Sequence, residues 1–137
     1  MRALNVTSDI LSPALLIALL AVLVGCLDPT EYVYSDPGGG YTLSTVNGVP
    51  VPTLLSTGDS LLSGEFHMAN MTATFTEKLN YRRGAGSPFS VGGEGTYKQD
   101  GTSLVFYTTG GLAFATGSYD NDKVTVVSDR TYVFLRN

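Results

Sequence analysis

The chain contains one cysteine and one histidine, the side chains that most readily serve as nucleophile, metal ligand or base near neutral pH. His67 lies in "GEFHMAN", where it alternates with Phe66 and Met68 as in a strand. A mononuclear zinc site needs further histidine, cysteine or carboxylate ligands, and none stands at a recognisable spacing from His67. We therefore interpret His67 as a solvated strand position, and we expect no metal and no cofactor.

Nucleophilic catalysis is the second chemistry that these residue types allow. Serines and aspartates accompany His67, so a hydrolase with a Ser-His-Asp triad is an alternative. No serine stands in the Gly-x-Ser-x-Gly pattern that forms a nucleophile elbow. We therefore predict a protein that is not an enzyme.

Two kinds of loop motif resemble ligand-binding loops. Asp120, Asn121 and Asp122 resemble part of a calcium loop, but the ligand spacing and the distal glutamate of an EF-hand are missing. A hairpin turn that uses Asn and Asp side chains is expected there instead. Gly92-Gly93 and Gly110-Gly111 lack the lysine that follows a phosphate-binding loop. Both pairs are predicted to form turns or bends.

The net charge of the chain argues against one class of partner, nucleic acids. Eight Lys and Arg residues face 12 Asp and Glu residues, which gives a net charge of −4. Nucleic-acid binding depends on lysine and arginine contacts to phosphate, so we do not expect a nucleic-acid partner. Arg82 and Arg83 in "YRRGAGSPFS" are adjacent. They could receive an anionic group at the mouth of a loop, or belong to an ordinary solvated loop.

The cysteine, Cys26, stands at the end of an apolar N-terminal segment. Residues 14–24 carry no charged or polar side chain, and Arg2 precedes them. A basic start followed by a short apolar run is typical of a secretory signal. A membrane-spanning helix needs roughly 20 apolar residues, which makes an uncleaved anchor the alternative. A small buried cysteine is the third interpretation, and a disulfide within one chain is excluded because it needs two cysteines.

Leu23-Val24-Gly25-Cys26 resembles the lipobox of bacterial lipoproteins. The resemblance implies cleavage between Gly25 and Cys26, a diacylglyceryl group on the Cys26 sulfur, and acylation of the new N-terminus. It also implies attachment to a membrane of the cell envelope, and Leu27 implies the outer membrane where two membranes are present. Two or more acyl chains make such attachment stable, because each buried methylene contributes about 0.8 kcal/mol.

These observations predict three parts: a cleaved signal peptide (1–25), the lipidated cysteine with a flexible tether (26–40), and a folded domain (41–137). Residues 27–40, "LDPTEYVYSDPGGG", contain two prolines and end in three glycines, so residues 38–40 are expected to be a hinge. Residues 32–34 could instead form an extra edge strand. Removing residues 1–25 leaves 112 of the 137 residues, enough for one small domain.

Residues 41–137 show the period-two pattern of β-strands between turn signals. In "SLLSGEFHMAN", for example, Leu62, Phe66 and Met68 are expected on one face. Asn47-Gly48 and Asp100-Gly101 are favoured pairs for tight hairpin turns. About eight or nine short strands follow one another without an apolar helical period. This pattern predicts an all-β fold, a small antiparallel up-and-down barrel of about eight strands, with a sandwich as the alternative.

A second resemblance rests on residues spread over most of the folded part: Tyr41, Leu43, Val46-Asn47-Gly48, Pro50, Pro52, Gly95-Thr96-Tyr97 and Tyr132-Val133-Phe134. With these residues the folded part resembles small bacterial lipoproteins described as lipocalin-like and functionally uncharacterised. The resemblance implies a lipocalin-like barrel. The folded part departs from true lipocalins because the chain has no tryptophan, so their Gly-x-Trp first strand is missing.

An eight-stranded barrel has an interior that its own side chains fill or that holds one small ligand. We therefore expect a lipid-anchored envelope lipoprotein that binds at most a small apolar ligand or an envelope protein. A structural or inhibitory interaction module that uses the barrel's outer surface is the alternative. The aromatic residues predicted to line or fill the interior are Phe66, Phe75, Tyr97, Phe106, Phe114 and Phe134.

Overall fold

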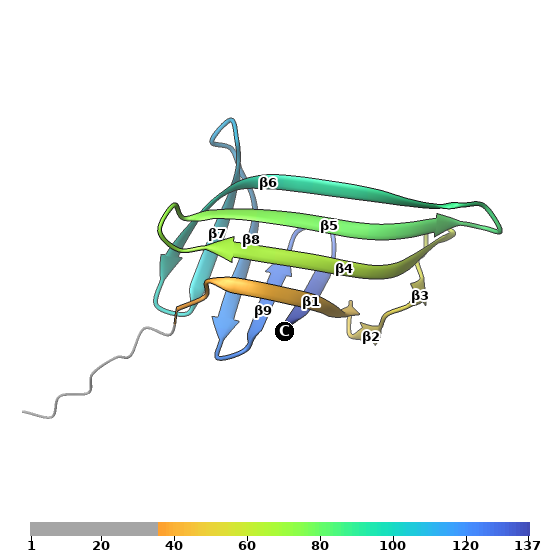
Figure 1. Cartoon of the computed structure of the whole chain (residues 1–137), viewed down its shortest axis with the longest axis horizontal. Helices are drawn as coiled ribbons and strands as arrows, with labels where there is room; N and C mark the ends of the chain where they lie inside the picture. The colour runs from red at the N-terminus through yellow and green to blue at the C-terminus, as the bar shows by residue number, and fades with distance from the viewer. Residues whose placement is uncertain (1–35) are drawn as a thin grey trace, which may run out of the picture. The chain divides into compact units, whose positions relative to one another are not determined.

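The computed structural model describes residues 36–137, which form strands joined by turns (Figure 1). The predictions of cleavage after Gly25, a lipid on Cys26 and a strand at residues 32–34 lie outside the described residues. Between residues 36 and 137 there is no helix of the length and apolar character that a membrane span requires. The strands are β1 (Gly39–Val46), β2 (Val49–Pro50), β3 (Thr53–Leu54), β4 (Asp59–Ala69), β5 (Thr74–Arg83), β6 (Pro88–Asp100), β7 (Ser103–Thr108), β8 (Ala113–Asp120), β9 (Lys123–Val127) and β10 (Thr131–Arg136).

Eight of these strands close into an antiparallel barrel, which confirms the predicted all-β, up-and-down architecture. Strands β4 to β10 pair in sequence order. Strand β1 closes the ring because it pairs with β10 through residues 41–46 and with β4 through residues 39–42. Strands β2 and β3 are short additions beside β1 and β4.

Alternating strand directions bring the turns to two ends of the barrel. Residues 36–38 and the turns that follow β4, β6 and β8 lie at one end, which we call the closed end. The turns that follow β5, β7 and β9, together with β2 and β3, lie at the other end, which we call the mouth. In Figure 1, β4, β5 and β6 run side by side, and the β5–β6 hairpin reaches beyond the end of β1 at the mouth.

The predicted hairpin turns form at the expected residues. Asn47 and Gly48 separate β1 from β2, and both have the positive φ angles that a tight turn of this class requires. Gly101 follows β6 with a φ of 59°, and Asn121 follows β8 with a φ of 53°. Gly111 has a φ of 80° in the turn between β7 and β8, as predicted for the Gly110-Gly111 pair.

The structure does not contain the hinge that was expected at residues 38–40. Gly39 and Gly40 belong to β1 and pair with β4, so the first strand starts before residue 41. Glycine suits these positions because Gly39 has a φ of 138°, and because a Cβ at Gly38 would lie 2.8 Å from the Asn70 side chain. The glycines here allow a close approach between segments of chain.

Two other local predictions are wrong. Gly92 and Gly93 lie inside β6 and not in a turn. Glycine suits position 92 because a Cβ there would lie only 2.8 Å from the Glu77 carbonyl of β5. A β-bulge between Leu61 and Ser63 also shifts the alternation along β4. As a result Leu61 is fully buried in the core, whereas Leu62 is only partly buried.

Aromatic side chains fill the middle of the barrel. The Phe66 ring lies 5.6 Å from Phe75, 5.7 Å from Phe106 and 5.1 Å from Phe134, measured between ring centroids. These four rings and Tyr97 are buried, as predicted for interior positions. Full burial of one such side chain contributes roughly 1.5–3 kcal/mol to stability, so this aromatic cluster is a substantial part of the core.

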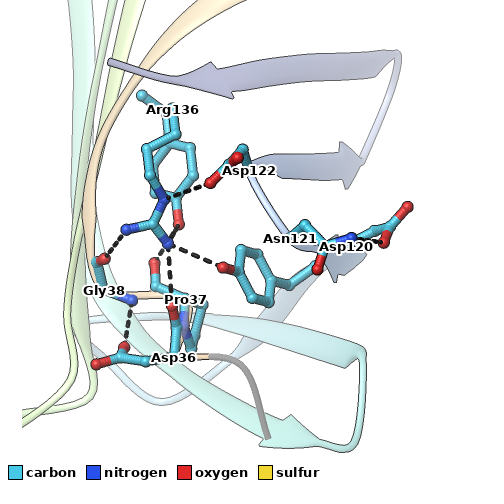
Figure 2. Close-up of polar contacts among 9 residues, drawn as sticks. Asp36, Pro37, Gly38, Asp120, Asn121, Asp122 and Arg136 are labelled. Atoms are coloured by element: carbon cyan, nitrogen blue, oxygen red, sulfur yellow. Dashed lines mark hydrogen bonds and ion pairs between the residues drawn. The ribbon is translucent and has the colours of Figure 1, made fainter. Parts of the chain in front are cut away.

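Arg136 organises the closed end of the barrel (Figure 2). Its Nη1 donates to the Gly38 carbonyl, and its Nη2 lies 2.9–3.0 Å from the Asp36 carbonyl and the hydroxyls of Tyr41 and Tyr119. The guanidinium also lies over both tyrosine rings, 5.1 and 5.8 Å from their centroids. Residues 36–38 are thereby tied to the end of β10.

The same contacts account for the electrostatics of the closed end. Burial raises the pKa of Tyr41 to about 12, although the nearby Arg136 charge acts in the opposite direction. The buried Arg136 Nε forms no hydrogen bond with any of residues 36–137, but it lies 3.3 Å from an Asp122 carboxylate oxygen as an ion pair. The closed end is therefore held by a polar network in place of an apolar plug.

Candidate ligand-binding site

A cleft of about 230 Å³ opens at the mouth of the barrel, which we call the mouth cleft. Its floor is aromatic, because the Tyr81 and Phe89 rings stack at a centroid distance of 5.7 Å. Val91 continues this floor along β6 and is 53% exposed. Leu55, Thr57 and Asp59, before and at the start of β4, complete one wall.

The length of β6 explains why the cleft forms at the mouth. Residues 88–96 of β6 pair with β5, but β7 pairs only with residues 95–100. Within the described chain, residues 88–94 therefore have a strand neighbour on one side only. The inner face of this part of β6 is left uncovered, and Phe89 and Val91 are exposed there.

Two guanidinium groups border the mouth cleft. Arg83, at the end of β5, donates from Nε to an Asp59 carboxylate oxygen at 3.1 Å, and its guanidinium lies 5.9 Å from the centroid of the Phe89 ring. Arg130, in the turn between β9 and β10, forms an ion pair with Asp129 at 2.9 Å. The Arg130 side chain is 20% exposed, whereas that of Arg83 is 79% exposed. The cleft thus combines an apolar floor with cationic groups at its rim.

Tyr132 connects Arg130 to the floor of the cleft. Side-chain hydrogen bonds link Tyr132 with both Tyr81 and Arg130. Burial raises the pKa of Tyr81 to about 12, with a further contribution from Tyr132, while the Arg130 charge acts in the opposite direction. The hydrogen bond with Tyr132 is the main reason that the pKa of Arg130 is raised. These groups keep their ordinary neutral-pH charges, so Arg130 remains a cation beside an uncharged phenol.

Glu77 lies below the mouth cleft on the inner face of β5. It pairs with Phe66 on β4 and with Gly93 on β6, and it alternates with the buried Phe75 and Leu79. Burial raises the pKa of the Glu77 carboxyl, and the Asp129 charge raises it further. A Cβ at Gly93 would meet no atom within 4 Å, so space is open beside this carboxyl.

The aromatic residues predicted to line a cavity do not line the mouth cleft. Phe66, Phe75, Tyr97, Phe106 and Phe134 are buried in the filled middle of the barrel and not in the mouth cleft. Phe114 differs from them, because it is 46% exposed; its ring lies 6.0 Å from that of Phe75, measured between centroids. Phe114 is the bulged residue of β8, because Phe106 pairs with Ala115 and Tyr107 pairs with Ala113, which leaves Phe114 without a partner on β7.

Other candidates from the sequence are also placed by the structure. His67 is exposed on the outer face of β4. Among residues 36–137, no three His, Cys, Asp or Glu side chains gather as metal ligands would. Of the arginine pair, Arg83 lines the mouth cleft and Arg82 is exposed on the opposite face of β5.

Sequence reasoning missed several residues of the cleft. Alternation along β5 was a usable signal, since it puts Glu77 and Tyr81 on the same face as Phe75. Phe89 pairs with Tyr81 across the β5–β6 hairpin, so the turn residues between them were a usable signal for that contact. No local pattern marks Arg130 as a neighbour of Tyr81, because β5 and the turn between β9 and β10 are far apart in sequence. In chemical terms the mouth cleft offers an apolar floor with guanidinium donors at its rim, and the Glu77 carboxyl lies on the inner face of β5 outside the cleft lining.

Comparison of the chain with protein-family models, with curated proteins and with solved structures finds no match.

Proposed function

We propose that this protein is a lipid-anchored lipoprotein of the cell envelope, without enzymatic activity, whose barrel binds a small apolar ligand in the mouth cleft. The observation that carries the binding function is the mouth cleft itself, where the Tyr81–Phe89 stack and Val91 form an apolar floor open to solvent. Binding sites for small molecules are concave and mainly apolar, with a few polar groups that set orientation.

The size of the cleft and the filling of the barrel limit the ligand. Sites for drug-sized ligands usually have volumes of about 300–1,000 Å³, so a cleft of about 230 Å³ suits a smaller molecule. The middle of the barrel is occupied by Phe66, Phe106 and Phe134. A ligand would therefore rest at the mouth, at the opposite end of the barrel from Asp36, where the described chain begins.

NMR spectroscopy tests the binding function. 3-Phenyl-1-propanol is a neutral probe with one ring and a short chain, and titration with it is expected to shift amide signals of residues around Tyr81, Phe89 and Val91. Amides at the closed end, such as Gly38 and Asn137, serve as the internal control and should not move. Absence of any saturable shift at the mouth would overturn the binding function.

The anchor rests on the resemblance of residues 23–26 to a lipobox. Fractionation of cells that express the chain is expected to recover the wild type with membranes and the Cys26→Ala variant in the soluble fraction or uncleaved. Lipid-linked attachment of two or more chains is effectively stable, whereas the variant has no acyl chain to bury. Membrane retention of a cleaved Cys26→Ala variant would refute the anchor and leave the mouth cleft unaffected.

A second candidate function, a protein-interaction module, is favoured by the one-sided edge of β6. Residues 88–94 present backbone groups that can pair with a strand from a partner. A photo-crosslinking residue at Ser90 on this edge is expected to capture an envelope protein if this function holds. The same residue at Thr125, on β9 between two partner strands, is the control. Equal labelling at both positions, or none, would eliminate this candidate.

A further inference from the structure

The two arginines of the mouth cleft come from different parts of the barrel and border the same space. Arg83 lies at the end of β5, and Arg130 lies in the turn between β9 and β10. Both line the cleft together with the Tyr81–Phe89 stack. A molecule resting on this stack would therefore have guanidinium groups within its surroundings.

Each guanidinium has donor groups left over from its contacts within the described chain. Arg83 uses Nε for Asp59, and no residue among 36–137 accepts a hydrogen bond from its Nη1 or Nη2. Arg130 uses Nη1 for Asp129 and also contacts the Tyr132 side chain. Guanidinium presents five N–H donors in a planar fork that matches a carboxylate. The cleft thus offers unused donors of the kind that bind an oxyanion.

Each arginine of the cleft is paired with one carboxylate, Arg83 with Asp59 and Arg130 with Asp129, so the formal charges of these four side chains cancel. The two ion pairs use only Nε of Arg83 and Nη1 of Arg130. The apolar floor and the remaining guanidinium donors are together complementary to a molecule with a compact apolar body and a carboxylate.

We propose that the mouth cleft binds a small apolar carboxylate, whose ring or branched body packs on Tyr81 and Phe89 and whose carboxylate accepts hydrogen bonds from Arg83 and Arg130. This inference rests on the proposed binding function and names its ligand class. It assigns Arg83 and Arg130 as the residues that select for charge, and the aromatic stack as the surface that holds the body of the ligand.

Three probes of matched size test the proposal: 3-phenylpropionate, 3-phenyl-1-propanol and 3-phenylpropylamine. Calorimetric or NMR titration uses the full-length chain with Cys26→Ala. The carboxylate is expected to bind at least about tenfold more tightly than the alcohol, equivalent to about 1.4 kcal/mol, and the amine more weakly than the alcohol. The preference should decrease as salt is added, because Arg83 is solvent-exposed.

Arginine variants separate charge selection from structure. Arg83→Gln and Arg130→Gln are each expected to reduce the carboxylate-to-alcohol preference while leaving affinity for the alcohol nearly unchanged. Arg82→Gln, next to Arg83 but on the opposite face of β5, is the control and should keep the full preference. Because Arg83 is largely exposed, its substitution leaves the fold intact even if Arg130→Gln unfolds the turn.

The outcomes distinguish this inference from the proposed function. Equal affinity for carboxylate and alcohol, or a preference that survives both arginine substitutions, overturns the ligand class and leaves the binding function standing. Failure of all three probes to bind at the mouth overturns the binding function and the inference together. A preference for the amine would instead indicate that the Glu77 carboxyl, and not the arginines, selects the ligand, and this also overturns the inference.

Discussion

Replacement of Arg136 is expected to loosen the closed end of the barrel and to lower stability. At least three hydrogen bonds are lost in Arg136→Met, because Nη1 donates to Gly38 and the two Nη2 hydrogens are shared among Asp36, Tyr41 and Tyr119. A typical intramolecular hydrogen bond contributes about 1 kcal/mol net. Because the Arg136 side chain is 30% exposed, water replaces part of the lost hydrogen bonding. Acceptors that stay buried without a partner add to the cost. We therefore expect a decrease of about 3 kcal/mol in the free energy of unfolding.

Urea unfolding followed by circular dichroism measures this change, and thermal unfolding should show a decrease of more than about 10 °C for a domain of this size. Hydrogen exchange should show faster exchange at Gly38 and Gly40, which the Arg136 network holds in place. Arg82→Met is the matched control, since Arg82 is exposed on the outer face, and it should change stability by less than about 0.5 kcal/mol. A loss below about 1 kcal/mol for Arg136→Met, or unchanged exchange at Gly38, would refute the assigned role of Arg136.

Three further changes test the barrel. The raised pKa of Glu77 means that its ionisation opposes folding, so Glu77→Gln should stabilise the chain at neutral pH. This gain should decrease as the pH falls through the raised pKa and be gone near the ordinary value of about 4.5; equal gains at pH 7 and near pH 4 in urea unfolding would contradict this. Gly95→Ala should lower the free energy of unfolding by about 1–3 kcal/mol, because its Cβ would lie 2.0 Å from the Tyr107 carbonyl. Gly93→Ala should be neutral or stabilising by up to about 1 kcal/mol, since its Cβ would meet no atom within 4 Å; similar unfolding midpoints in urea for the two variants would count against the register of β6. Phe106→Ala should cost about 3–5 kcal/mol and Phe114→Ala about 1 kcal/mol or less, as measured by chemical unfolding, and the reverse order would place Phe114 in the core.

The architecture was predictable because it depends on local patterns. Period-two alternation identified strands, and Asn47-Gly48 and Asp100-Gly101 located hairpins, since tight turns of this kind select residues that tolerate positive φ. Sequential hairpins then implied an up-and-down barrel. Alternation also predicted that Phe66 and Phe134 face the interior, because each lies in a stretch of strand without a bulge.

The errors arose where the backbone departs from regular alternation or where distant segments meet. A bulge in β4 buries Leu61 in place of the predicted Leu62, and a bulge in β8 falls at the exposed Phe114. Gly39 was interpreted as part of a hinge and Gly92 as part of a turn or bend, although both lie within strands and permit close contacts that only their neighbours in the fold explain. The mouth cleft joins Arg130 to Tyr81 across the barrel, and a single sequence contains no signal for such a contact.

Native mass spectrometry of the full chain, expressed with its own N-terminus and extracted gently from membranes, tests most directly whether the mouth cleft holds a small ligand. We expect a polypeptide that begins at Cys26 and carries acyl groups, together with a reproducible small-molecule adduct that is lost on denaturation. The adduct should also be lost when Val91→Trp fills the cleft, while Leu135→Trp on the exposed side of β10 retains it. A wild-type chain that never carries an adduct would refute the binding of a small ligand in the mouth cleft.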